Sequence, residues 1–221
     1  MKNVIALFLV LSSLAFHAQS ASADAVQLKG KSLDAWFKSY FQWYHTGSKP
    51  RKYVVDGVRY LPLPQPDSIA VDPTHPFPDL AWFGGTVDIS VKASQFLLVP
   101  VSAWNGESYK DGTPPDDLPS ILQDLDVFNG TDVTIKMDGK TVFSGTAAQL
   151  SKFHFGPVYF DQPIPYAHPT SYGAIAAIWE EGTGIFYRPH GVGPHTLEIV
   201  AITPVLGIAF DNIWNIKVVE K

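Results

Sequence analysis

The chain has 221 residues, of which 46% are hydrophobic and 17% are charged, and its formal net charge is −5. This length and apolar content are enough for one domain with a substantial core, and they exclude disorder as a global description. The acidic balance argues against a nucleic-acid partner, which requires a basic face. Because the sequence has no cysteine, disulfides, thiol nucleophiles and thiolate metal sites are excluded.

The N-terminus predicts an export signal. Lys2 gives a short cationic start, residues 4–16 form an apolar run, and Ala21-Ser22-Ala23 matches a small-x-small cleavage site. We therefore expect residues 1–23 to be a signal peptide that is cleaved after Ala23. The apolar run is too short to cross a bilayer comfortably, and no transmembrane segment is expected in the mature chain. An exported protein without disulfides is typical of bacteria, so the predicted location is the periplasm or the extracellular space.

The segment 24–50 is expected to contain a helix rich in aromatic residues. Ser32 is a typical N-cap residue, and large apolar side chains follow it at spacings of three and four from Leu33 to Tyr44. Gly47 follows the pattern as a stop signal. Two interpretations of the aromatic side chains stay open. They either clamp the helix against a sheet or form an exposed stacking platform for a sugar or a partner.

Turn residues and short apolar runs dominate residues 51–221. Asp56-Gly57 and Asp138-Gly139 each separate two such runs, which is the strongest local signal for a hairpin with a type I′ turn. Residues 86–92 alternate apolar and polar side chains, and 95–101 predicts a more buried strand in which Pro100 indicates an edge or a bulge. Further strands are expected at 153–160, 174–179, 184–188, 195–202 and 208–219, with a loop at 106–119 and a short helix near 118–125.

This number of short strands predicts a mainly β protein. We expect an antiparallel β-sandwich of jelly-roll type, with one short N-terminal aromatic helix. The segments 24–50 and 51–221 are expected to form a single globular unit.

Several blocks of the sequence resemble, in their motifs and in their order, an uncharacterised family of exported bacterial β-rich proteins with an N-terminal Trp-rich helix. These blocks are 30–43, 80–85, 96–101, 137–140 and 193–199. Because no activity is assigned to that family, the resemblance implies export and a shared β-rich fold, and it transfers no catalytic residue. At the level of fold alone, 193–199 and 210–213 are similar to strands of jelly-roll carbohydrate-binding modules.

Familiar catalytic motifs are missing from the sequence. It has no Gly-x-Ser-x-Gly elbow, no Ser-x-x-Lys, no His-Glu-x-x-His and no phosphate-binding loop. Glu180 and Glu181 follow an apolar run and could include the general acid of a glycosidase pair. Since adjacent strand residues point to opposite faces, only one of them could face a given cleft. The alternative is that both are solvated carboxylates at a strand end.

Metal-binding patterns are weak. Asp124, Asp126 and Asn129 partly match a calcium loop, but the spacing is displaced by one residue and no glutamate closes the loop. The histidines of the mature chain form no His-x-His pair on one strand face. We therefore expect no metal and no cofactor.

Two histidines flank a glycine- and proline-containing turn near Arg188. These residues, His190 and His195, could converge with His154 or His168 across the sheet. A surface or capping role is the expectation for each of them.

The leading functional hypothesis is a non-enzymatic exported protein that binds a ligand, with a glycan as the candidate, or takes part in cell-surface or periplasmic assembly. The candidate binding residues are Trp82, Trp104 and Trp179, whose indoles could stack on a sugar ring, together with Arg188 and His190. The alternative for the tryptophans is that they fill the core. Two further function classes stay open: a secreted hydrolase of a polysaccharide or an ester, and a structural protein that self-assembles.

Overall fold

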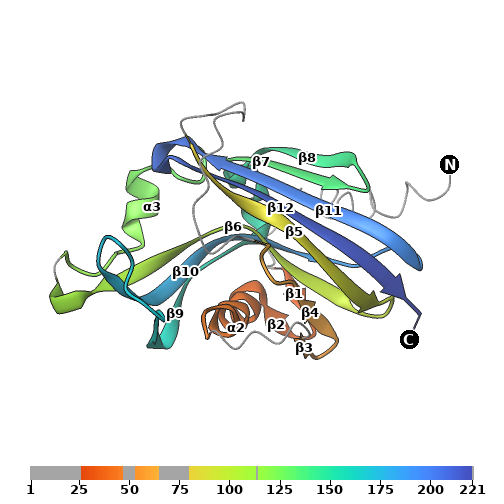
Figure 1. Ribbon diagram of the computed structural model, residues 1–221, viewed down its shortest axis with the longest axis horizontal. Helices are drawn as coiled ribbons and strands as arrows, with labels where there is room; N and C mark the ends of the chain where they lie inside the picture. The colour runs from red at the N-terminus through yellow and green to blue at the C-terminus, as the bar shows by residue number, and fades with distance from the viewer. Residues whose placement is uncertain (1–25, 47–52, 65–79, 113, 221) are drawn as a thin grey trace, which may run out of the picture.

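The computed structural model describes residues 26–46, 53–64, 80–112 and 114–220. In this part of the chain two five-stranded sheets pack face to face, and a helix covers the outer face of one of them (Figure 1). The prediction of a mainly β, sandwich-like fold with one aromatic helix is confirmed. The predicted signal peptide, residues 1–23, lies outside the described residues.

Each sheet combines strands from distant parts of the chain. Sheet 1 consists, in order, of β3 (Val54–Val55), β4 (Val58–Tyr60), β6 (Phe96–Tyr109), β10 (Ala174–Tyr187) and β9 (His154–Pro165). Sheet 2 consists of β5 (Ala81–Lys92), β12 (Ile208–Val219), β11 (Gly193–Thr203), β7 (Asp132–Met137) and β8 (Lys140–Thr146). The remaining elements are β1 (Gln27–Leu28), β2 (Lys31–Ser32), α2 (Leu33–His45), α3 (Ser120–Asp124) and the 3₁₀ segments Lys110–Gly112, Ala147–Phe153 and Pro204–Leu206.

The two predicted Asp-Gly hairpins are present. Asp56 and Gly57 have φ angles of 51° and 79°, and Asp138 and Gly139 have φ angles of 48° and 74°. Positive φ at both central residues is what a type I′ turn requires, and it matches the twist of the flanking strands. These turns join β3 to β4 and β7 to β8.

The sheets are mixed rather than purely antiparallel. β4 pairs with β6 in parallel, and β12 pairs with β5 in parallel over the full length of both strands. A parallel pair needs a long crossover connection instead of a tight turn, so turn signals in the sequence do not reveal it. The remaining pairs are antiparallel among the strands described.

Some predicted boundaries were wrong. The two strands expected at 174–179 and 184–188 are one strand, β10, and the first residues of the loop expected at 106–119 belong to β6. The pair Glu180 and Glu181 suggested a solvated strand end, whereas the structure buries both in the middle of β10. The short helix expected near 118–125 is present as α3.

The aromatic side chains of α2 belong to the core. The helix therefore packs against a sheet and does not present these side chains as an exposed stacking surface. Ser32 caps the helix by accepting a hydrogen bond from the backbone N–H of Ala35. Six side chains of the helix are buried against sheet 1: Leu33, Trp36, Phe37, Tyr40, Phe41 and Trp43. The ring of Phe37 stacks on Phe155 of β9 with ring centroids 4.1 Å apart. Sheet 1 is therefore covered on both faces, by α2 and by sheet 2.

A bulge in β6 changes which face its side chains occupy. Pro100 pairs with Gly184 and Ser102 with Thr183, so Val101 has no partner on β10. Before the bulge, Val99 belongs to the core between the sheets, whereas after it Ala103 packs on the helix side. The bulge that Pro100 indicated is confirmed, and it turns the odd-numbered residues of β6 toward α2.

Candidate functional site

A partly open pocket of about 130 Å³ lies where α2, β6, β10 and β12 come together. Its walls carry three aromatic rings, several aliphatic side chains and five polar side chains. The lining residues are Phe41, Tyr44, His45, Leu63, Pro100, Val101, Ser102, Ala103, Asn105, Glu180, Phe210 and Asn212. Apolar walls with a few fixed polar groups are the usual composition of a small-molecule site.

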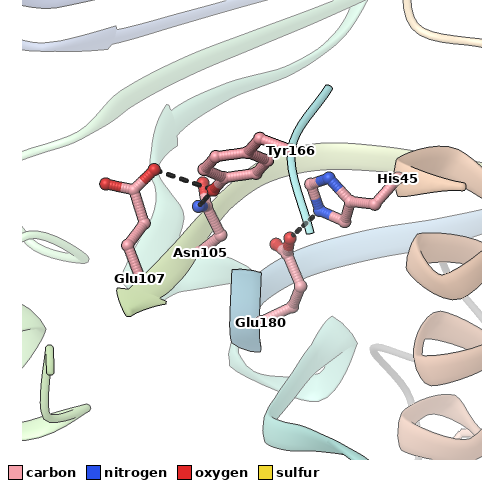
Figure 2. A network of polar contacts seen from close by, with 5 residues as sticks. All are labelled: His45, Asn105, Glu107, Tyr166 and Glu180. Atoms are coloured by element: carbon pink, nitrogen blue, oxygen red, sulfur yellow. Dashed lines mark hydrogen bonds and ion pairs between the residues drawn. The ribbon is translucent and has the colours of Figure 1, made fainter. Parts of the chain in front are cut away.

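A histidine–glutamate pair forms one wall of the pocket. His45 Nε2, from the last turn of α2, lies 2.6 Å from Glu180 Oε1 in the middle of β10 (Figure 2). The imidazole is held between aromatic rings, since its centroid lies 6.0 Å from that of Phe160 and 6.4 Å from that of Tyr166. This packing fixes the ring that faces Glu180.

The Glu180 side chain is almost completely buried. Its residue is 2% exposed, and this burial raises the pKa of the carboxyl above its ordinary value, while the hydrogen bond from His45 acts in the opposite direction. A buried carboxyl at the wall of a pocket, partnered by an imidazole, has the features of a group that binds a ligand or transfers a proton.

A second chain of hydrogen bonds fixes Asn105, which also lines the pocket. Asn105 Nδ2 donates to Tyr166 Oη at 2.7 Å, and Tyr166 Oη donates to Glu107 Oε1 at 2.7 Å (Figure 2). Tyr172 Oη also donates to Glu107 Oε1, at 3.2 Å. Burial is the main cause that raises the pKa of the Tyr166 hydroxyl far above its ordinary value, and the hydrogen bond to Glu107 raises this pKa further. Tyr166 therefore stays protonated and acts as a fixed hydrogen-bond relay.

Asn212 of β12 brings a further acceptor to the wall of the pocket. The residue is 4% exposed, and its Oδ1 atom has no hydrogen-bond partner within the described residues. A buried amide oxygen without a partner costs about 1–3 kcal/mol. A ligand that donates a hydrogen bond to Asn212 would remove this cost.

The neighbouring glutamate forms a similar pair on the other face of β10. Glu181 Oε1 lies 3.1 Å from His154 Nε2, and the His154 ring packs edge-on against Phe128. The expectation that Glu180 and Glu181 face opposite sides is thus confirmed. The interpretation of Glu180 and Glu181 as solvated carboxylates was wrong, because tertiary contacts bury both side chains and give each an imidazole partner.

The predicted tryptophan candidates do not line this pocket. Trp82 is 7% exposed and packs with Leu80 and Ala209, while Trp104 and Trp179 are 8% and 1% exposed and share a small cluster next to α3. The Trp179 indole donates to the backbone oxygen of Asp117. All three indoles serve the core in this conformation.

The other two candidates, Arg188 and His190, follow β10 and are exposed. The Arg188 guanidinium lies over the ring of Phe96, 5.5 Å from its centroid. Of the histidines near it in the sequence, His195 instead contacts Asp138, with Nδ1 and Oδ2 3.0 Å apart. The structure therefore brings none of the five predicted binding residues into the pocket.

Sequence reasoning missed His45, Asn105, Tyr166 and Asn212 as site residues. The available signals were local: His45 comes directly after the helical spacing that was predicted to Tyr44, and Asn105 lies beyond the strand predicted at 95–101. Nothing in the sequence indicates that these positions meet Glu180, because that contact spans 135 residues.

No group of three or more His, Asp or Glu side chains in the described part of the chain is arranged to hold a metal ion. Asn129, in the partial calcium-loop pattern, donates its side-chain amide to Asp126 Oδ1. Among the same residues, no helix is long and apolar enough to cross a membrane.

Comparisons with known protein families, with characterised proteins and with solved structures found no significant match. The resemblance to a family of exported bacterial proteins accordingly stays a prediction from the sequence blocks.

Proposed function

We propose that the protein is an exported ligand-binding protein whose site is the pocket between α2, β6, β10 and β12, and that its ligand contains a sugar residue. The observation that carries the proposal is Asn212 Oδ1 on the wall of this pocket, which is buried and has no hydrogen-bond partner among the residues that the structure describes. A native structure leaves such an acceptor unpaired at a cost, and pairing it with a ligand turns that cost into binding free energy.

The remaining lining residues support a sugar. A sugar ring has an apolar face of C–H groups and an edge of hydroxyl groups, so it needs both aromatic and polar contacts. Phe41, Tyr44 and Phe210 supply aromatic surface, while Asn105 and Glu180 supply polar atoms that other side chains already hold in place.

Binding is tested with a matched pair of variants on one strand. Asn212→Leu removes the buried acceptor and fills part of the pocket, whereas Asn215→Leu makes the same change at an exposed position of β12. Calorimetric titration against a panel of mono- and oligosaccharides should identify at least one ligand. Asn212→Leu should weaken it tenfold or more, equal to about 1.4 kcal/mol, while Asn215→Leu should leave it unchanged. Equal effects of the two variants, or no ligand in the panel, would contradict the proposal.

A hydrolase is the second candidate, and the environment of Glu180 favours it. A buried carboxyl with a raised pKa, hydrogen-bonded to an imidazole and open to a pocket, suits a general acid. Glu180→Gln preserves the shape and removes the acid. Release of sugars or alcohols from polysaccharide and ester substrates by the native protein, lost in Glu180→Gln even at substrate concentrations that saturate the variant, would identify an enzyme. Binding without turnover in both proteins would leave the binding function alone.

Export is part of the proposal and has its own test. If residues 1–23 form a cleaved signal peptide, protein recovered from the periplasm or the culture medium should begin at Asp24. N-terminal sequencing checks this, and an exported fraction that begins at Met1 would contradict it.

A further inference from the structure

We propose that the group bound in this pocket is a primary ammonium, so that the ligand is an amine, such as an amino sugar, rather than a neutral sugar. This inference rests on the binding function proposed above and narrows its ligand class. It follows from the direction of the hydrogen bonds around the pocket and from the charges on its walls.

The hydrogen bonds through Tyr166 determine how the side-chain amide of Asn105 is oriented. The Glu107 carboxylate can only accept, so Tyr166 uses its single proton for the bond to Glu107 Oε1. Tyr166 Oη must then accept from Asn105, which uses one of the two N–H donors of its amide for that bond. The bond fixes the orientation of the amide and leaves its carbonyl oxygen unbound to Tyr166. Asn105 can therefore offer a ligand an acceptor as well as its second N–H.

The other polar side chains of the pocket are also rich in acceptors. Asn212 contributes a buried Oδ1 that has no partner in the described part of the chain, and Glu180 contributes a carboxylate of which one oxygen contacts His45. Together with Asn105 this makes three acceptor groups from β6, β10 and β12. A primary ammonium has three N–H donors and no acceptor, so it complements such a set.

The charges favour a cation as well. Glu180 lines the pocket, and the carboxylate of Glu107 lies behind Asn105 and Tyr166. Among the lining residues described, His45 is the only one with a basic side chain, and it is already engaged by Glu180. The rings of Phe41, Tyr44 and Phe210 add π faces, which attract cations where water is excluded.

The size of the pocket limits the ligand. An apolar cavity of roughly 150 Å³ holds one benzene molecule, so about 130 Å³ holds one small ring or a short chain. A simple alkylamine fits within this volume, whereas an amino sugar such as glucosamine would place its ammonium end inside and extend through the open side of the pocket. The experiment separates them.

The first measurement uses the native protein and four small probes: glucosamine, glucose, N-acetylglucosamine and butylamine. We expect glucosamine to bind at least tenfold more tightly than glucose or N-acetylglucosamine, which lack the ammonium. Butylamine as tight as glucosamine would identify a simple amine as the source, and weaker butylamine would identify the amino sugar. Equal affinity for glucose and glucosamine would overturn the ammonium inference and leave sugar binding intact. Failure of both amines to bind would overturn it too, whatever the neutral sugars do.

The second measurement removes the charge. Glu180→Gln is nearly isosteric and should reduce the affinity for the amine tenfold or more, with a much smaller effect on a neutral sugar. Glu198→Gln is the matched control, because Glu198 lies on β11 paired with Lys136 and away from the pocket residues. Equal losses in the two variants, or an unchanged preference for the amine in Glu180→Gln, would overturn the proposal.

Discussion

At the scale of single residues, the central feature is a pair of consecutive glutamates in the middle of a strand. Glu180 and Glu181 point to opposite faces of β10, and each is buried against a histidine from another element. Burying a carboxylate in a core is costly unless it is paired and hydrogen-bonded. The two imidazoles, His45 and His154, provide that partner.

The buried Glu180 predicts a specific pH dependence of stability. Because burial raises its pKa in the folded protein above the ordinary value of 4.5, the folded state keeps its proton over a pH range in which the unfolded state has lost it. The free energy of unfolding should therefore fall as pH rises from about 4.5 through the raised pKa, by about 1.4 kcal/mol for each pH unit that separates the two values.

Glu180→Gln should lack this decline, so its stability relative to the native protein should increase as pH rises through the same window. Urea denaturation of both proteins between pH 4 and pH 8 measures the difference. Glu198→Gln, which removes a half-buried carboxylate on β11, calibrates the effect of losing a charge. Parallel curves for the native protein and Glu180→Gln would show that Glu180 is not responsible.

At the scale of elements, α2 acts as a third layer. Its buried aromatic side chains pack on β4, β6 and β9, and the Trp36 indole donates a hydrogen bond to the backbone oxygen of Leu28. The helix also carries Phe41, Tyr44 and His45 to the pocket. The packing of the helix and the geometry of the pocket therefore depend on the same contacts.

Trp43→Ala tests the anchoring role of the helix. Trp43 is buried and stacks on Tyr53 with centroids 5.5 Å apart, so its truncation should cost about 3–5 kcal/mol, the usual range for a buried large aromatic. Gln42→Ala, at the half-buried neighbouring position, should change stability by about 0.5 kcal/mol or less. Chemical denaturation gives both values. A small cost for Trp43→Ala, similar to that of Gln42→Ala, would argue against the packing described.

At the scale of the whole molecule, the layers meet at close contacts that tolerate no extra atoms. Gly184 lies in β10 directly under the ring of Phe37, and a Cβ atom at this position would collide with that ring. Sheet 1 can hold α2 this closely only because the residue at 184 has no side chain.

Gly184→Ala should therefore destabilise the protein by about 1–3 kcal/mol, the usual cost of overpacking a core. Combining it with Phe37→Leu, which shortens the colliding side chain, should make the double variant more stable than the sum of the two single changes implies. A double-mutant cycle in urea measures this coupling. Additive effects would show that the two residues do not press on each other.

Local sequence patterns determined the parts of this protein that depend on neighbouring residues. The two Asp-Gly turns, the Ser32 cap, the helical spacing of the aromatics and the break at Pro100 each express the conformational preference of a few consecutive residues. These preferences act without the rest of the fold, so the sandwich and its helix were predictable.

Only the tertiary structure decided the site. The parallel pairings of β4 with β6 and of β5 with β12 join segments that no tight turn connects, and the pocket combines His45, Asn105, Glu180 and Asn212 from four elements. Sequence periodicity shows which face of its own strand or helix a side chain occupies, but not what lies opposite that face. Glu180 therefore resembled a solvated strand end in the sequence, and it became a buried acid because α2, distant in the chain, packs over it.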